Sequence, residues 1–189
     1  MNICVYGAAS NLIHPEFLSE GEKLGEALAN AKHGIVYGGG AEGMMGAVAR
    51  GAVRKGGYIL GISPNFFKVD GVLFENCSEF IYTETMRERK QLLEERSDAF
   101  IVTPGGIGTF DEFFEIFALR QLKRHEKPIL LYNIRGYFNP IIEMLNSAAE
   151  QGFMKKANLS LFGVASTPNE ALAYFADFTS TGDKIEDYR

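Results

Sequence analysis

The chain has 189 residues, of which 46% are apolar, and a formal net charge of −5 with a pI near 5.3. This length suits one well-packed domain rather than two, and the apolar content supports a sizeable core. The acidic balance excludes a nucleic-acid polymer and an anionic membrane as expected partners, since both require a basic surface, but it is compatible with a local pocket for one phosphate.

Two further features predict a cytoplasmic protein. The first residues read as a strand, without a basic leader region or a long apolar one, and no apolar run approaches the ~20 residues that cross a bilayer.

The two cysteines, Cys4 and Cys77, lie far apart and match no metal-ligand spacing. Cys4 stands in an apolar run, where a buried reduced thiol is expected. We therefore expect no metal site.

Strands and helices are predicted to alternate along the chain. Each predicted strand is a short apolar run, and each predicted helix carries apolar residues near helical spacing. In chain order, the sequence predicts a strand at 2–6, a helix at 15–31, a strand at 34–37, a helix at 43–55, strands at 58–62 and 79–83, a helix at 85–97, a strand at 99–103, a helix at 109–122, a strand at 128–132, a helix at 139–151, a strand at 161–165 and a helix at 168–175. Residues 63–72 are predicted to be irregular.

The pattern of the strands predicts the fold class. They read as continuous apolar runs rather than alternating ones, which is typical of a parallel sheet covered by helices on both faces. No linker or internal repeat divides the chain. We predict a single α/β domain, residues 1–178, with a Rossmann-like doubly wound sheet of about six or seven strands, followed by a polar tail at 179–189. A ligand should bind at the carboxyl ends of the strands, near the point where the strand order reverses.

Two glycine loops follow predicted strands and open predicted helices. The first begins Gly-Gly-Gly at 38–40, and the second reads Pro-Gly-Gly-Ile-Gly at 104–108. The loop after the first predicted strand, Gly-Ala-Ala-Ser-Asn at 7–11, lacks the G-x-G-x-x-G fingerprint, and neither glycine loop is a P-loop. The strand at 34–37 leads into Gly38 rather than an acid, so NAD, FAD and triphosphates are disfavoured. One loop could cradle a monophosphate at a helix N-terminus, while the other lets a sugar or base lie close to the backbone.

Cations interrupt the apolar stripe of the helix at 85–97. Met86, Arg89, Lys90 and Leu93 recur at the spacing of one helix face, which normally covers a sheet, yet two of the four are cationic. Arg89 and Lys90 could snorkel past the sheet or pair with a structural acid. They could equally contact an anionic ligand at the carboxyl edge, and the spacing leaves both interpretations open.

Glu112 also has two interpretations. Thr109-x-x-Glu112 fits a capping box with Thr109 as the N-cap, and Asp111 and Glu112 would complement the helix dipole. Spacing alone favours this structural role. A phosphate bound to the same N–H groups would instead leave Glu112 free to face the ligand as a catalytic group.

Several stretches together resemble the LOG (Lonely Guy) family. Residues 104–112 match its PGGxGTxxE motif, and residues 86–90, Met-Arg-Glu-Arg-Lys, match its MxxRK element. Residues 38–46 resemble its GGGxxGLMG loop with Met44 for the usual Leu, and residues 133–139 resemble the segment after its sixth strand. The loop after the first predicted strand differs from the family, because it reads Gly-Ala-Ala-Ser at 7–10 where many members have Gly-Ser-Ser.

This resemblance implies an activity and a set of site residues. It implies hydrolysis of the N-glycosidic bond of an adenosine 5′-monophosphate, in particular an N6-modified one, to a cytokinin-type base or adenine and ribose 5-phosphate, with no cofactor. It also implies a homodimer with the site near the subunit interface. Arg89 and Glu112 match the family's catalytic pair. The implied substrate-binding residues are Gly39, Gly40, Gly43, Met86, Lys90, Pro104, Gly105, Gly106, Gly108 and Thr109.

Two other functions remain open from the residues. A non-catalytic carrier of a nucleotide or of a molybdenum cofactor would explain the glycine loops, but not an Arg and a Glu that converge on one edge. A structural Arg89–Glu112 ion pair would involve no ligand. Family members are also described as possible lysine decarboxylases, but no pyridoxal-phosphate lysine motif supports that activity here.

Overall fold

A computed structural model describes residues 1–181, and its centre is a seven-stranded sheet. The strands are β1 (Asn2–Tyr6), β2 (Gly34–Tyr37), β3 (Ile59–Pro64), β4 (Glu79–Thr83), β5 (Ala99–Val102), β6 (Ile129–Tyr132) and β7 (Gly163–Ala165). Every neighbouring pair is parallel, and the order is β4-β3-β2-β1-β5-β6-β7. The direction of winding reverses between β1 and β5, which confirms the predicted doubly wound fold.

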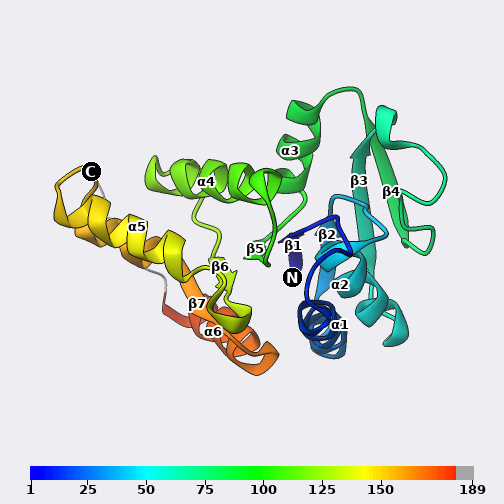
Figure 1. The fold of residues 1–189 in the computed structure, drawn as a ribbon, viewed down its shortest axis with the longest axis horizontal. Coiled ribbons are helices and arrows are strands. Elements are labelled where there is room, and N and C mark those ends of the chain that lie inside the picture. The colour runs from blue at the N-terminus through cyan, green and yellow to red at the C-terminus, as the bar shows by residue number, and fades with distance from the viewer. Residues whose placement is uncertain (182–189) are drawn as a thin grey trace.

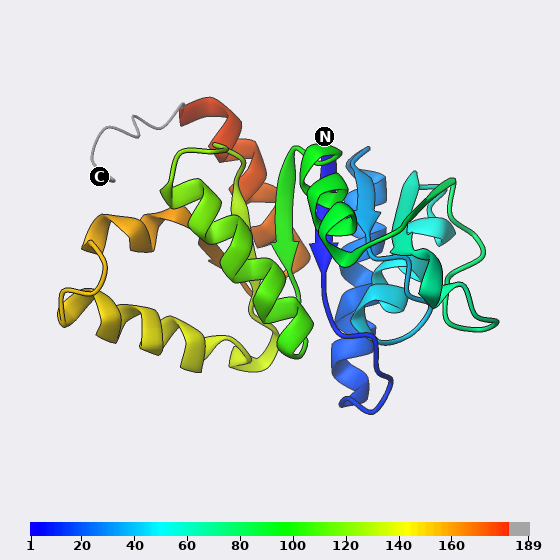
Figure 2. The same cartoon turned by 90° about the horizontal axis from the view of Figure 1, so that it is seen from above.

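Helices cover both faces of the sheet. They are α1 (Pro15–Asn30), α2 (Gly43–Arg54), α3 (Met86–Glu95), α4 (Ile107–Gln121), α5 (Asn139–Glu150) and α6 (Pro168–Thr181), with short 3-10 turns η1 (Asn65–Phe67), η2 (Ile134–Gly136) and η3 (Lys156–Leu161). Figures 1 and 2 show α1, α2 and α6 on one face and α3, α4 and α5 on the other. None of the described helices is long and apolar enough to cross a membrane.

The core consists of two apolar clusters, one on each face. Successive strand residues point to opposite faces, so β1 contributes Ile3 and Val5 to the cluster with α1, α2 and α6. Its alternate residues Cys4 and Tyr6 join the cluster under α3, α4 and α5. All four are at most 3% exposed. This two-sided burial is why the strands read as continuous apolar runs.

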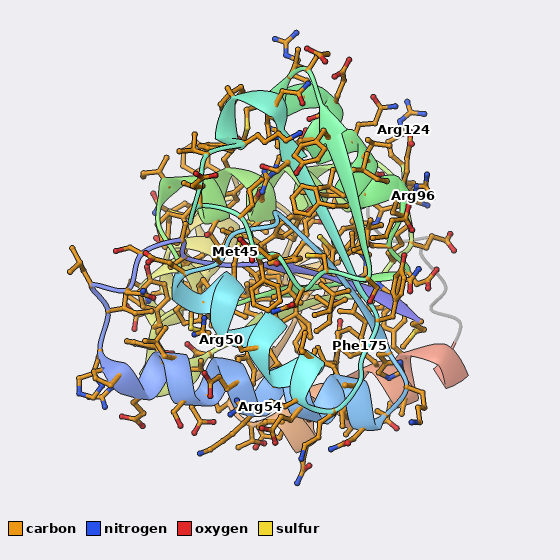
Figure 3. All side chains as sticks on the ribbon, turned by 90° about the vertical axis from the view of Figure 1, so that its right-hand side faces the viewer. Met45, Arg50, Arg54, Arg96, Arg124 and Phe175 are labelled. Carbon is orange, nitrogen blue, oxygen red and sulfur yellow. The ribbon has the colours of Figure 1, made fainter. Side chains whose placement is uncertain are left out.

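Helices α1 and α2 pack backbone to backbone, and this contact positions the second helix. A Cβ on Gly25 would lie 2.0 Å from the Val48 carbonyl oxygen, and one on Gly51 would lie 2.0 Å from that of Glu22. Only glycine permits so close an approach. Figure 3 shows Arg50 and Arg54 on α2 beside α1, where the Arg50 Nε lies 3.2 Å from Glu22 Oε1. The N-terminus of α2 and the glycine loop before it are thereby held against the sheet.

The elements differ from the sequence prediction mainly at their ends. The third strand extends to Pro64, and the last strand begins at Gly163 because the 3-10 turn η3 occupies the residues before it. Helix α6 continues to Thr181 rather than ending at Phe175, so it includes the first three residues of the predicted tail. The rest of that tail, 182–189, lies outside the described residues. The division into a domain at 1–178 and a tail stays a prediction.

Candidate functional site

Three loops meet at the carboxyl edge of the sheet, where the winding reverses. The Ala8 N–H donates to the Pro104 carbonyl oxygen at 3.0 Å, and the Met45 N–H donates to the Ala8 carbonyl oxygen at 3.2 Å. The Gly43 N–H donates to Asn11 Oδ1 at 2.8 Å. The loop after β1 therefore ties both glycine loops together. In the sequence this loop stood out only by its departure from the family's Gly-Ser-Ser, and none of its residues was among the predicted site residues.

These loops border a cavity of about 790 Å³, which is within the range of small-molecule sites. The cavity contains most of the predicted site residues. Those that line it are Gly40, Met86, Arg89, Lys90, Gly106, Gly108, Thr109 and Glu112. Gly39, Gly43, Pro104 and Gly105 belong to the same loops but do not line the cavity.

Gly39 and Gly43 shape the loop instead. Both have left-handed backbone, with φ of +76° and +62°, which is costly for a residue with a side chain. A Cβ on Gly43 would also lie 2.3 Å from the Ala8 carbonyl oxygen. That either glycine contacts a ligand remains a prediction.

Arg89 of α3 and Glu112 of α4 form a buried ion pair at the cavity. Arg89 Nη1 lies 2.7 Å from Glu112 Oε1, and each side chain is 9% exposed. The guanidinium lies against Gly38, the residue directly after β2, since a Cβ on Gly38 would be 2.2 Å from Arg89 Nη2. The sequence placed these two charges at one edge, and the structure brings them into direct contact. In a dinucleotide-binding protein the strand would end in an acid at this position. The glycine found here leaves the space that Arg89 needs.

The surroundings raise the pKa of both Glu112 and Lys90, which disfavours the charged form of the glutamate and favours that of the lysine. Burial raises the pKa of Glu112, and the adjacent Arg89 opposes that rise by attraction and hydrogen bonding. Lys90 Nζ lies 2.6 Å from Glu115 Oε2 and 3.1 Å from Asp111 Oδ2, and the hydrogen bond with Glu115 raises its pKa. Lys90 lines the cavity, where these two carboxylates oppose its positive charge.

The predicted capping box at Thr109 is wrong. Helix α4 begins at Ile107 with Gly106 as its N-cap, so Thr109 is already the third helical residue and Glu112 the sixth. Gly106 adopts extended backbone at φ −94° and ψ −154°, which lets the helix begin before the threonine. No side chain in the described part of the chain caps this N-terminus. Its first-turn N–H groups are therefore available to an anion.

The segment predicted to be irregular supplies one wall of the cavity. Phe67 and Val72 of this segment line the cavity, together with the next residue, Leu73. The Ala41 N–H donates to the Val72 carbonyl oxygen at 3.0 Å, which joins this wall to the first glycine loop. These residues were not among the predicted site residues, since polar residues and glycine interrupt the segment and it has no periodicity. Among residues 1–181, no group of three or more His, Cys, Asp or Glu side chains is arranged to hold a metal ion.

The fold is shared with proteins of known structure. The molybdenum cofactor binding protein from Rippkaea orientalis superposes with a TM-score of 0.71 at 20% identity, over 94% of this chain and 96% of that one. The molybdenum cofactor carrier protein from Chlamydomonas reinhardtii superposes with a TM-score of 0.71 at 20% identity, over 95% and 98% of the two chains. Identity this low establishes the fold alone.

Sequence relatives are more similar and define the family. The model of a family described as possible lysine decarboxylase matches residues 45–175. The chain is 37% identical over 170 residues to the cytokinin riboside 5′-monophosphate phosphoribohydrolase of Mycobacterium tuberculosis, which covers 90% of each protein. It is 34% identical over 183 residues to a protein of that name from Arabidopsis thaliana, covering 97% of this chain and 80% of the relative. The chain therefore belongs to the LOG family.

Proposed function

We propose that the protein is a nucleoside 5′-monophosphate phosphoribohydrolase that acts on AMP and its N6-modified forms. The observation that carries this proposal is the buried Arg89–Glu112 pair, which lies in one cavity with an uncapped helix N-terminus. The names of relatives up to 37% identical support the same activity. The carrier alternative is weaker, because its support is a likeness of fold at 20% identity.

The 5′-phosphate binds at the N-terminus of α4 in this proposal. Gly106, Gly108 and Thr109 line that end of the cavity, and the N–H groups of the first helical turn carry a partial positive charge. Binding the phosphate there fixes the ribose relative to Glu112. Orientation of this kind can supply a large part of the catalytic barrier reduction.

Glu112 and Arg89 carry the chemistry at the anomeric carbon. The bond from C1′ to the base nitrogen breaks, and its electron pair leaves with the base while positive charge develops on the ribose ring. The Glu112 carboxylate stabilises this charge or takes the proton of the attacking water. The new C1′–O bond gives ribose 5-phosphate, and the base leaves with a proton. Arg89 holds the carboxylate ionised and in place.

The base lies against the apolar wall. Phe67, Val72 and Met86 are apolar residues that line the cavity, and an adenine with an apolar N6 substituent would bury apolar surface against them. By the resemblance to the family, we further propose a cytoplasmic homodimer with the site near the subunit interface. Sedimentation of the purified protein tests the oligomeric state.

Incubation of purified protein with AMP and with an N6-alkylated AMP tests the function. We expect free base and ribose 5-phosphate in equal amounts, separated and quantified by chromatography. Tight binding of the nucleotide without turnover would instead support a carrier. If neither binding nor turnover occurs, Arg89–Glu112 is a structural ion pair.

The pH dependence should show that a raised carboxyl pKa limits activity. Because burial raises the pKa of Glu112 above the usual value of an exposed glutamate, the Glu112 carboxylate is lost at a higher pH than that of an exposed glutamate. Activity should be present above this raised pKa and fall as the pH is lowered through it. Profiles of kcat and kcat/KM measure this acid limb.

The substrate phosphate also titrates, near pH 6, and needs its own control. The affinity for ribose 5-phosphate, measured over the same pH range, reports that titration separately. An acid limb at or below about pH 4.3, the usual pKa of an exposed glutamate, would contradict the role of Glu112.

A further inference from the structure

A tyrosine outside the predicted site residues binds the second glycine loop. The Tyr137 hydroxyl donates a hydrogen bond of 2.5 Å to the Gly105 carbonyl oxygen. The two residues are 32 positions apart in the sequence. They meet because β5 and β6 are neighbours in the sheet, so the loops that follow these strands share one edge.

The segment that carries Tyr137 is itself tightly constrained. Asn133 Oδ1 accepts a hydrogen bond from the Phe138 N–H at 2.7 Å, and Asn133 Nδ2 donates to Asn139 Oδ1 at 2.8 Å. Phe138 is fully buried. Arg135 has left-handed backbone at φ 55°, which a non-glycine residue keeps only where its surroundings enforce it. These contacts therefore restrain the backbone that carries Tyr137 and so the position of its hydroxyl.

The hydrogen bond sets the orientation of one peptide group. In a trans peptide the C=O of one residue and the N–H of the next point in opposite directions. A Gly105 carbonyl that faces Tyr137 therefore turns the Gly106 N–H away from Tyr137. Gly106 lines the cavity and is the N-cap of α4, whereas Gly105 does not line the cavity.

The loop is held from its other side as well. The preceding carbonyl, that of Pro104, accepts from the Ala8 N–H at 3.0 Å. Thr109 Oγ1 lies directly against Gly105, since a Cβ on that glycine would be 2.1 Å away. The Tyr137 hydroxyl adds a restraint from the segment that follows β6. Burial raises the pKa of Tyr137, so the hydroxyl stays protonated and donates at neutral pH.

We propose that Tyr137 is a positioning residue that preorganises the Gly105–Gly106 peptide for binding of the substrate's 5′-phosphate. The proposal rests on the phosphoribohydrolase function above, in which this loop binds the phosphate. Tyr137 acts through the loop and touches neither the ribose nor the base. Its contribution should appear in the affinity for phosphorylated ligands and leave the rate of bond cleavage nearly unchanged.

The substitution Tyr137→Phe tests this, because it removes only the hydroxyl. We expect the Kd for ribose 5-phosphate, measured by calorimetry, to rise about three- to tenfold, as for loss of one neutral hydrogen bond. The KM for AMP should rise by a similar factor with kcat changed less than about twofold. Affinity for adenosine, which lacks the phosphate, should stay the same.

Tyr174→Phe is the matched control. The Tyr174 hydroxyl donates to the Ile129 carbonyl oxygen at 3.0 Å, at the opposite end of β6 from Asn133. This variant also loses a tyrosine–carbonyl bond, but it should bind ribose 5-phosphate like the wild type. Thermal unfolding of both variants measures any general loss of stability.

Distinct results separate the possible failures. Unchanged ribose 5-phosphate affinity in Tyr137→Phe would overturn the proposal, and so would an equal loss of adenosine affinity, which indicates a merely structural role. If Tyr137→Phe weakens ribose 5-phosphate binding but the wild type hydrolyses no monophosphate, the positioning role stands and the proposed function fails.

Discussion

Replacing Glu112 with glutamine should lower the rate of base release from AMP by about 10²- to 10⁴-fold. Glutamine keeps the size of the side chain, and its amide oxygen can still accept from Arg89, whose Nη1 lies 2.7 Å from Glu112 Oε1. What is lost is the negative charge that stabilises the developing cation or takes the proton from water. Because the phosphate site proposed above lies at the N-terminus of α4 and not at Glu112, the affinity for ribose 5-phosphate should change little.

Glu115→Gln is the matched control for this variant. Glu115 lies one turn further along α4, is 42% exposed and pairs with Lys90. The same chemical change at this position should leave kcat within about twofold of the wild type. Steady-state assays of free base on both variants make the comparison. Near-full activity in Glu112→Gln would remove Glu112 from the mechanism.

Replacing Arg89 with methionine should affect both activity and stability. The substitution leaves the Glu112 carboxylate buried without its partner, since both side chains are 9% exposed. Breaking a buried pair in this way costs about 3–5 kcal/mol of unfolding free energy. Base release should fall as well, because Arg89 no longer holds the carboxylate ionised. Denaturant unfolding at neutral pH measures the loss of stability.

The pH dependence of that loss has a definite sign. Arg89 lowers the pKa of Glu112 and burial raises it, so removal of Arg89 raises this pKa further above its value in the unfolded chain. The loss of unfolding free energy in Arg89→Met should be largest at pH values above the raised pKa, where Glu112 is ionised. This loss should shrink as the pH falls through that pKa and Glu112 becomes protonated.

Two further variants test whether the loss of stability comes from the unpaired Glu112 charge. The double variant Arg89→Met, Glu112→Gln removes the unpaired charge, so it should recover much of the lost stability while staying inactive. Lys90→Met breaks only a more exposed cluster and should cost less than about 1 kcal/mol. A double variant as unstable as Arg89→Met alone would show that the instability does not come from the buried charge.

Local sequence information determined most of the fold. The strands at Asn2–Tyr6, Gly34–Tyr37 and Glu79–Thr83 have the predicted bounds, because each is a short apolar run ended by small or polar residues. Burial on both faces makes such runs continuous, so the parallel sheet and its helical layers follow from the same pattern. The glycine loops also followed from the sequence, since their composition is a local property.

The role of Glu112 shows what local information cannot decide. Thr109 and Glu112 have the spacing of a capping box, and that interaction requires only neighbouring residues. The helix instead begins at Ile107, and Glu112 contacts Arg89, 23 residues away. The choice depends on the extended backbone of Gly106 and on the packing of α3 beside α4. Both are consequences of the assembled sheet.

The sequence by itself determined the element order, the parallel sheet, the sheet edge at which the cavity lies and the residue types of the catalytic candidates. Only the tertiary structure decided that Arg89 and Glu112 are paired and buried, that the 63–73 segment forms a cavity wall, and that Tyr137 holds Gly105. The physical reason is the range of the interactions. Burial patterns and backbone preferences are encoded within a few residues, whereas these contacts join residues that only the order of the strands brings together.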